Sequence, residues 1–478
     1  MPDPSPAFGR RSLLRGAIGV AAAAALPLAR PALAAAPMAL RAAPGRQAIA
    51  GAGWPETAVW CFNGRVPGTE VRLRQGQRLR VRAENGLAEG TTVHFHGVRM
   101  PNAMDGVPHL TQPPIAPGAD FLYDFTVPDA GTFWYHPHQR SSEQVGRGLY
   151  GAVVVEEAEP PDVDRDLLWV LDDWRLQRDG AIAGDFGNLM DISHAGRLGN
   201  TVTINGTDPE PLKVRPGERL RLRLVNAANA RIFGLTFAGE LPWLIANDGQ
   251  PCQPDQLPGG RLVLAPGGRA DLIIDVSGRD GDRLAVTDDF YRNQSYRLTE
   301  LVCEGPTRVA RLSEPRALPP NPLPEPDLAK APTHEIVLGG GMMGGMAGGT
   351  VMGGPMNGRR LDLREMMHNG LAWTVNGVAA TGHVLDPLLT LDRGASYRLV
   401  LRNDTAWWHP MHLHGHSFRV VARDGAPEEP AEWRDTVLLY PQETVQIAFV
   451  ADNPGDWMFH CHILEHQQGG MSAVVRVA

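Results

Sequence analysis

The chemically richest stretch of the chain, residues 457–471, lies just before its C-terminus. It holds five side chains able to bind a metal: His460, Cys461, His462, His466 and Met471. Successive side chains of a β-strand point to opposite faces, so in a strand His460 and His462 share one face while Cys461 takes the other. A thiolate, two imidazoles and a weak thioether form the ligand set of a blue-copper electron-transfer centre. A zinc site, or a buried free cysteine among core histidines, is also compatible with this stretch alone.

An Asn-Gly turn, a second Gly turn and an alternating strand recur three times along the chain. The three turns begin at Asn63, Asn205 and Asn376, and apolar residues alternate with polar ones in the strands that follow. This alternation is typical of a strand half-buried in a β-sandwich. With 54 glycines, 41 prolines and little helical periodicity, the chain is predicted to be all-β with about three domains.

The repeats also predict where the domains lie. We expect a leader over residues 1–36, β-sandwich domains over 37–158, 159–306 and 333–478, and a Pro-rich linker over 307–332. The ends of the first and third repeats match at a constant offset of 324 residues, so that His136 corresponds to His460. Pro137 then stands at the position of Cys461, and the first domain keeps paired histidines without the thiolate. The second repeat has no such cluster, which predicts a metal-free spacer.

Histidines gather in four short clusters at matching ends of the first and third repeats. These clusters hold eleven of the 16 histidines: His94 and His96; His136 and His138; His409, His412, His414 and His416; and His460, His462 and His466. A single histidine in a sandwich strand is more often a core or surface residue than a metal ligand. Four clusters at corresponding places are not explained in that way, and neutral imidazole is a preferred copper ligand.

These motifs, in this order, resemble those of the multicopper oxidases, the family of laccases, ascorbate oxidases and bacterial copper-efflux oxidases. The resemblance covers essentially the whole predicted mature chain and implies three tandem cupredoxin-like Greek-key β-sandwich domains that hold four copper ions. It implies a type 1 copper on His409, Cys461 and His466 with Met471 axial. It also implies a type 2 copper on His94 and His412, and a type 3 pair on His96, His136, His138, His414, His460 and His462. His416 falls outside the pattern.

The activity implied by the resemblance is the one-electron oxidation of a donor coupled to four-electron reduction of dioxygen to water. Cys461 would bind the collecting copper, and its covalent neighbours would bind the cluster that consumes the electrons. Asp105 matches an acidic residue that relatives place near the cluster, which makes it a candidate proton donor; a turn-capping aspartate before Gly106 is the alternative. Gln467 stands where many bacterial members have a glutamate, so their usual proton relay is in doubt here.

Two features predict different donors. Residues 339–356 are rich in Gly and Met and resemble the Met-rich insert of copper-efflux oxidases, whose thioethers suit Cu(I). A disordered lid, or methionine used as adaptable packing, is an equally simple explanation of this segment. In contrast, Trp407 and Trp408 precede His409 and favour a phenolic donor. A phenolic compound and a metal ion therefore both stay open as donors.

The N-terminus resembles a twin-arginine export signal. Arg10 and Arg11 precede an Ala-rich stretch and a small-residue cleavage region near residues 34–36. We therefore expect recognition by the twin-arginine export machinery, a periplasmic location and no stable membrane insertion. Removing this leader, with its four arginines and one aspartate, takes the formal net charge from −8 to −11, which argues against nucleic-acid binding.

Four cysteines are few for an exported chain. If Cys461 binds copper, Cys252 and Cys303 are the pair expected to form a disulfide, with Cys61 a buried free thiol. A non-catalytic periplasmic protein that sequesters copper or serves as a scaffold is the main alternative to an oxidase. Members of that kind lose copper ligands, whereas all the expected positions are filled here. A copper nitrite reductase is disfavoured by the paired histidines and the third repeat.

Overall fold

The three predicted Asn-Gly turns have the backbone conformation of tight hairpin turns. The angle φ is 55° at Asn63, 53° at Asn205 and 48° at Asn376, and φ is also positive at the glycine after each of them. Two consecutive residues with positive φ are what a type I′ turn requires, and Asn-Gly adopts them at little cost. The same turn therefore occurs in each of the three repeats.

The computed structural model describes residues 36–308, 313–342, 349–352, 358–383 and 386–478. Met38–Ala478 form one unit and Met1–Pro37 another. The predicted leader thus lies outside the described residues, except for Ala36. Within the described parts of the chain, no helix is long and apolar enough to cross a membrane.

The first β-sandwich consists of two four-stranded sheets. One has the strand order β2 (Thr57–Phe62), β1 (Met38–Gln47), β4 (Arg78–Asn85) and β6 (Asp120–Thr126). The other has the order β3 (Val71–Arg74), β8 (Gly151–Glu156), β7 (Gly131–His136) and β5 (His94–His96). A buried apolar cluster that includes Phe95, Tyr123 and Phe133 lies in this sandwich.

The second sandwich consists of a six-stranded and a five-stranded sheet. The first has the order β10 (Thr201–Ile204), β9 (Arg165–Trp174), β12 (Arg219–Asn226), β17 (Arg269–Asp275), β14 (Trp243–Asn247) and β15 (Gln250–Gln256). The second has the order β11 (Leu212–Val214), β19 (Tyr296–Cys303), β18 (Arg283–Asp288), β13 (Phe233–Phe237) and β16 (Arg261–Leu264). Its core includes Leu222, Phe233 and Leu272.

The third sandwich consists of a ten-stranded and a five-stranded sheet. The larger has the order β22 (Arg359–Leu361), β21 (Gly349–Met352), β24 (Val378–Ala380), β23 (Trp373–Val375), β20 (Thr333–Gly340), β26 (Ser396–Asn403), β32 (Thr444–Val450), β28 (Phe418–Arg423) and β29 (Ala426–Pro427), and β30 (Trp433–Arg434) also pairs with β28. The smaller has the order β25 (Leu389–Leu391), β34 (Ser472–Val477), β33 (Gly455–Cys461), β27 (His409–Leu413) and β31 (Thr436–Leu439).

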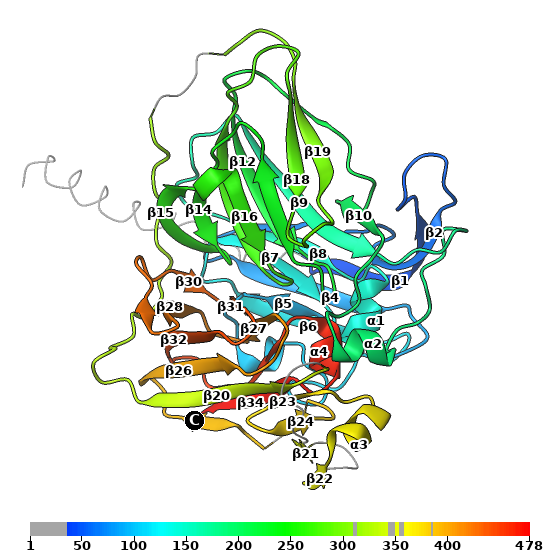
Figure 1. Cartoon of the computed structure of the whole chain (residues 1–478), viewed down its shortest axis with the longest axis vertical. Coiled ribbons are helices and arrows are strands. Elements are labelled where there is room, and N and C mark those ends of the chain that lie inside the picture. The colour runs from blue at the N-terminus through cyan, green and yellow to red at the C-terminus, as the bar shows by residue number, and fades with distance from the viewer. Residues whose placement is uncertain (1–35, 309–312, 343–348, 353–357, 384–385) are drawn as a thin grey trace, which may run out of the picture. The chain divides into compact units, whose positions relative to one another are not determined.

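The all-β prediction is confirmed, since the described helices are short. They are α1 (Ser141–Gly146), α2 (Leu189–Ser193), α3 (Leu363–His368), α4 (Leu464–Gln468) and the 3₁₀ turns η1 (Asn102–Met104) and η2 (Pro258–Gly260). Helices α1, α2 and α4 come from the first, second and third sandwich, and they lie side by side (Figure 1). Asn229 of the second sandwich links α1 and α4, because its amide donates to Glu465 of α4 (2.8 Å) and to the carbonyl of Ser142 in α1 (2.7 Å).

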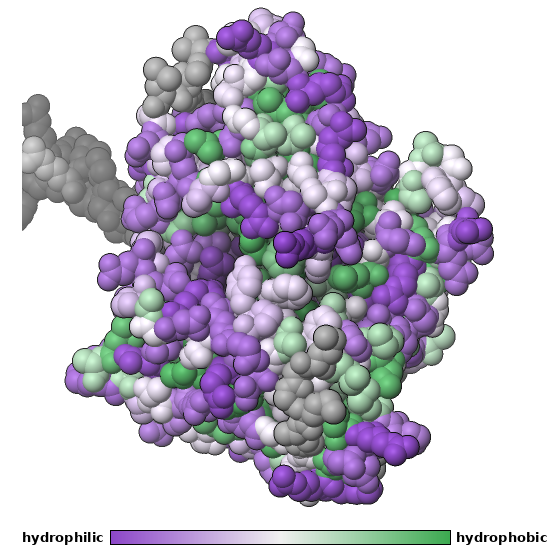
Figure 2. Space-filling view, viewed as in Figure 1, coloured by the Kyte–Doolittle hydropathy of each residue, from purple (hydrophilic) through white to green (hydrophobic). Residues whose placement is uncertain are grey.

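The surface drawn in Figure 2 carries mainly polar side chains, with apolar ones in small, scattered patches. Among the described residues, the large apolar side chains that are most exposed include Met190 at 65% and Leu189 at 41%, which are neighbours in α2. Isolated apolar residues on a surface need no explanation, and these two form a small apolar patch on α2.

Candidate metal centre

Strand pairing brings the predicted histidine clusters together. In the first sandwich, β5 pairs with β7 so that His94 lies opposite His136. In the third sandwich, β27 pairs with β33 so that His412 lies opposite His460. Residues that face each other across an antiparallel pair are neighbours in space. The first and third sandwiches therefore each present a group of imidazoles, as the matching repeats predicted.

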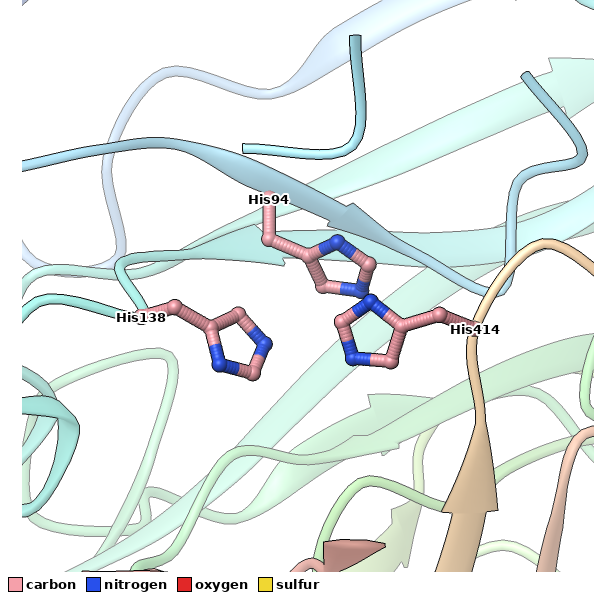
Figure 3. A group of neighbouring side chains, drawn as sticks. All are labelled: His94, His138 and His414. Atoms are coloured by element: carbon pink, nitrogen blue, oxygen red, sulfur yellow. The ribbon is translucent and has the colours of Figure 1, made fainter. Parts of the chain in front are cut away.

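The two groups meet in one buried cluster between the first and third sandwiches. Its eight members are each at most 1% exposed: His94, His96, His136, His138, His412, His414, His460 and His462. The rings of His94 and His414, from different sandwiches, stack with their centres 4.0 Å apart. Figure 3 shows His94 and His138 of the first sandwich converging with His414 of the third.

The unpaired ring nitrogens of this cluster are the observation that fits metal ions. Within the described parts of the chain, these buried nitrogens have no hydrogen-bond partner: His94 Nε2, His96 Nδ1, His136 Nε2, His138 Nε2, His412 Nε2, and both nitrogens of His462. The Nε2 atoms of His414 and His460 face each other at 3.1 Å. A buried polar atom without a partner is costly, and shared cations would satisfy these convergent lone pairs.

The opposite nitrogens of most of these rings are bound by acceptors. His94 Nδ1 donates to the carbonyl of Asp105 (2.7 Å), His412 Nδ1 to that of Asp435 (2.8 Å) and His460 Nδ1 to that of Cys461 (2.9 Å). Such hydrogen bonds fix the tautomer of a metal-binding histidine and its ring orientation. In these three rings Nε2 is therefore left without a proton and directed into the cluster.

A second group lies on the other side of Cys461. His409 Nδ1 and His466 Nδ1 lie 3.6 Å and 3.7 Å from Cys461 Sγ, and 3.1 Å from each other. Their Nε2 atoms are bound to Thr405 Oγ1 (2.9 Å) and to the carbonyl of His194 (2.6 Å). All three candidate ligands are fully buried. Two imidazole lone pairs and one sulfur thus point at a common position.

Met471, the predicted axial ligand, is also fully buried. Its backbone joins the same group, because its carbonyl accepts from Cys461 N (3.1 Å) and its N–H donates to the carbonyl of His466 (2.9 Å). The segment between Cys461 and Met471 includes the short helix α4, which carries His466.

Burial sets the protonation of both groups. It lowers the pKa of His466 to about 3, and it lowers the pKa of His409 and His460 well below the usual range. These imidazoles are therefore neutral near pH 7, which is the form that binds a metal. Burial also raises the pKa of the Cys461 thiol, so a bound cation is needed to keep the thiolate that copper requires.

Asp105 belongs to the cluster rather than to a solvent-exposed turn. Its side chain is fully buried, and its carboxylate accepts from His414 Nδ1 (2.9 Å) while it lies 3.2 Å from His94 Nδ1. One carboxylate thus contacts a histidine of the first sandwich and a histidine of the third. A turn also follows Asp105, as expected if this residue caps a turn. Gly106 has a φ of 78°, and a Cβ there would clash with Val93.

Comparison with known proteins decides the family. Sequence models of the multicopper oxidases match residues 46–160 and 359–478. The multicopper oxidase MmcO of Mycobacterium tuberculosis is 30% identical over 455 residues, which cover 88% of this chain and 83% of the relative.

The chain belongs to the multicopper oxidase family.

Solved structures agree with this assignment. A multicopper oxidase from Pseudomonas thermotolerans is 35% identical, with a TM-score of 0.80, and the match covers 93% of this chain and 99% of the other. Lac15 from a marine microbial metagenome is 38% identical, with a TM-score of 0.72, over 92% of this chain and 100% of the other. Copper binding and the use of dioxygen with a donor substrate follow from the family.

This multicopper oxidase has cluster residues that sequence reasoning missed. Asp435 is 1% exposed, and its Oδ1 lies 3.2 Å from His96 Nε2 and 3.3 Å from His412 Nδ1. Thr436 Oγ1 lies 3.2 Å from the same two nitrogens. Asp435 lies between β30 and β31 and Thr436 begins β31, where no histidine or spacing pattern marks them in the sequence.

A cavity of about 380 Å³ reaches the cluster of the multicopper oxidase on the side of His138. Gln467 and His383 line it, and the ring centres of His383 and His138 lie 6.2 Å apart. Gln467 Nε2 lies 3.2 Å from His138 Nδ1, and Gln467 Oε1 accepts from Ser141 Oγ (3.0 Å). Amide oxygen and nitrogen can exchange places, so Gln467 is able to accept a hydrogen bond from His138 Nδ1, but it cannot supply a proton as a carboxyl would.

The predicted disulfide of the multicopper oxidase is wrong. All four cysteines are free, and Cys252 and Cys303 lie in different sheets of the second sandwich, on β15 and β19. The Cys61 prediction is confirmed, because this thiol is buried and unpaired. His416 is buried but makes hydrogen bonds to backbone groups of His414 (3.2 Å) and Asn453 (3.4 Å) instead of joining the cluster.

Proposed function

We propose that this multicopper oxidase takes electrons one at a time from a donor at a type 1 copper and delivers them to a trinuclear copper cluster that reduces dioxygen to water. His409, Cys461 and His466 would hold the type 1 copper, with Met471 axial. His94 and His412 would hold the type 2 copper. The type 3 pair would be held by His96, His136, His138, His414, His460 and His462.

One observation carries this proposal: Cys461 belongs to one ligand group, and both of its covalent neighbours belong to the other. His460 and His462 are members of the eight-histidine cluster, while Cys461 Sγ faces His409 and His466. The backbone around Cys461 therefore forms a short covalent connection between a site that collects electrons and a site that needs four of them. A single zinc site would require only one of these groups.

Asp105 is the residue we propose for proton supply to this cluster. Its carboxylate is buried against His414 and His94, where it can hold a proton close to the position at which dioxygen is reduced. The cavity beside His138 and Gln467 supports an entry path for dioxygen and an exit path for water. Because Gln467 cannot act as an acid, the proton path on that side differs from one that uses a carboxylate.

Donor electrons would enter through His466. Its Nε2 donates to the carbonyl of His194, directly after α2, and α2 exposes Leu189 and Met190. The His194 ring lies edge-on to Trp407, with centres 5.3 Å apart. This apolar, partly aromatic surface supports a phenolic donor as the first candidate.

Cu(I) is the second candidate donor, and the Met-rich segment that begins beside α2 favours it. Met342 N donates to the carbonyl of Ser193 (3.0 Å), and its carbonyl accepts from Trp407 Nε1 (2.8 Å). The Met-rich segment 339–356 thus starts beside α2, although residues 343–348 and 353–357 lie outside the described ones. Thioethers are soft ligands suited to Cu(I).

Replacing the five methionines of segment 339–356 with leucine tests both donors. If the segment admits Cu(I), oxygen consumption with Cu(I) falls roughly tenfold or more at limiting donor, since losing even the hydrogen-bond partners of metal ligands costs about 10–100-fold in affinity. Oxygen consumption with a phenol stays within about twofold and serves as the internal control. Unchanged Cu(I) oxidation would exclude the segment as an entry site, and no oxygen consumption with either donor in the unaltered protein would contradict the oxidase proposal.

We also propose export to the periplasm by the twin-arginine machinery, a route that carries folded proteins. The support is the Arg10-Arg11 motif followed by an Ala-rich stretch. Replacing both arginines with lysine in the producing bacterium tests it, because the protein is then expected to accumulate in the cytoplasm with its leader uncleaved.

A further inference from the structure

Arg269 is a fully embedded arginine where the three sandwiches meet. It lies in β17 of the second sandwich, which contributes no candidate copper ligand, and it is 1% exposed. Its Nε donates to the carbonyl of Thr132 in the first sandwich (3.3 Å), and its Nη1 donates to Asp435 in the third (2.8 Å). A single side chain therefore connects all three sandwiches.

All five N–H donors of this guanidinium are used. Besides Thr132 and the Asp435 oxygen already named, Nη1 donates to the carbonyl of Gly267 (3.1 Å), and Nη2 donates to the carbonyl of Asp248 (2.9 Å) and to the second oxygen of Asp435. A planar fork that binds both oxygens of a carboxylate fixes the orientation of that carboxylate. Arg269 therefore sets the rotation of the Asp435 side chain.

Asp248 of the second sandwich fixes the backbone at the same place. Its Oδ1 accepts from Arg269 N (3.0 Å), and its Oδ2 accepts from the N–H groups of Asp435 (3.3 Å) and Thr436 (3.1 Å). Both the backbone and the side chain of Asp435 are thus held from the second sandwich. The buried opposite charges of Arg269 and Asp435 compensate each other, so removing Arg269 leaves the Asp435 carboxylate without its buried cation.

Asp435 in turn contacts one candidate ligand from each side of the cluster. His96 Nε2 donates to its Oδ1 (3.2 Å), and His412 Nδ1 donates to its carbonyl (2.8 Å). The bond to His96 determines which of its nitrogens faces the cluster. It occupies Nε2 and leaves Nδ1 directed into the cluster, whereas His94 and His412 direct Nε2 there. Thr436 Oγ1, which also lies 3.2 Å from this nitrogen, donates its own proton to Asp435 Oδ1 (2.8 Å), so the placement of Asp435 helps to select that tautomer of His96.

A second contact from the second sandwich, just before β17, reaches the cluster directly. Gly267, in the turn between β16 and β17, has a φ of 79°, and a Cβ there would lie 2.7 Å from the His462 ring. This turn therefore packs flat against His462, which has no hydrogen-bond partner on either ring nitrogen among the described residues. Packing against Gly267 takes the place of the missing hydrogen bond in orienting this ring.

We propose that the copper-free second sandwich positions the trinuclear cluster: Arg269, aided by Asp248, orients Asp435 so that His96 and His412 present the correct nitrogens. Arg269 is a positioning residue, since among the described residues it makes no hydrogen bond to a candidate ligand and acts through Asp435. The proposal rests on the assignment of His96 and His412 as copper ligands. It makes the second sandwich part of the copper site instead of a spacer between two copper-binding sandwiches.

Two matched variants test the proposal, Arg269→Gln and Arg221→Gln. Arg221 is a fully buried arginine of the same sheet, and it binds Glu157 and Asp271 at 2.6 Å each. Neither of these carboxylates contacts a candidate ligand among the described residues, so Arg221→Gln reports the structural cost of losing a buried arginine. Copper per chain, the blue absorption band, the type 2 EPR spectrum and the melting temperature are measured for both variants and for the unaltered protein.

For Arg269→Gln we expect roughly 10–100-fold weaker copper retention at the cluster, an altered type 2 EPR spectrum and an unchanged blue band. For Arg221→Gln we expect a similar loss in melting temperature with full copper and an unchanged EPR spectrum. Equal copper content and equal EPR spectra in the two variants would overturn the proposal. If Arg269→Gln does not fold, Arg269→Lys keeps the charge without the fork, and an unaltered type 2 spectrum in that variant would overturn it as well.

The outcomes also separate this proposal from the proposed function. If the unaltered protein lacks the blue band and the type 2 signal, the assignment of copper sites fails. If it has both and the Arg269 variants keep them unchanged, only the positioning role fails.

Discussion

Cys461→Ser is expected to remove the blue colour of the copper-loaded protein and to bring donor oxidation below detection. Cys461 supplies the sulfur of the group with His409 and His466, and a serine hydroxyl does not provide the soft anionic ligand that a blue-copper site requires. The eight-histidine cluster does not use this sulfur, so the type 2 EPR signal is expected to persist. Absorption and EPR spectra, together with oxygen consumption, measure these effects.

Cys61→Ser is the matched control for this variant. Cys61 is a fully buried free cysteine of the first sandwich, and its thiol donates only a weak hydrogen bond to the carbonyl of Ala43 (3.6 Å). The control protein should remain blue and active, with at most a modest change in stability. A Cys461→Ser protein that stays blue, or that still oxidises donors, would refute the type 1 assignment.

Asp105→Ala is expected to lower turnover by roughly 10²–10⁴-fold, the range that a positioned acid or base contributes. The carboxylate contacts His414 and His94 within the cluster. Among the described residues, it makes no hydrogen bond to the group of Cys461 with His409 and His466. The blue band, and its bleaching by donor in the absence of oxygen, should therefore stay normal while reoxidation by dioxygen slows. Stopped-flow measurement of both half-reactions distinguishes the two steps.

Asp105→Asn separates proton supply from positioning. The amide oxygen can still accept from His414 Nδ1, but the side chain cannot carry a proton. If Asp105 supplies protons, the Asn variant is as slow as the Ala variant and its pH–rate profile changes shape. If dioxygen reoxidises the Asn variant at the wild-type rate, the role of Asp105 is limited to orienting His414. Asp129→Asn, at a buried aspartate paired with Arg99 (2.7 Å), is the control and should reoxidise normally.

The sequence was sufficient to predict the features that depend on local patterns. Strand alternation separates Cys461 from His460 and His462, and the same alternation places His94 and His96 on one face of β5. The constant offset between the first and third repeats predicted that their histidines occupy corresponding places, and the strand pairings of β5 with β7 and β27 with β33 agree with it.

Contacts between distant parts of the chain were not predictable in this way. Asp435 contacts His96, which is 339 residues away in the sequence, and Arg269, which is 166 residues away. No periodicity or motif in the sequence predicts either contact. The predicted disulfide failed for the same reason, because membership of one sandwich does not say whether Cys252 and Cys303 share a sheet. Packing between sandwiches decides these contacts, and it depends on surfaces rather than on local sequence.

Copper content and colour of the purified, copper-loaded protein test the central claim most directly. The two ligand groups, joined through Cys461 and its neighbouring histidines, predict a blue protein with about four coppers per chain and both type 1 and type 2 EPR signals. A colourless protein that binds a single zinc ion per chain would contradict the account.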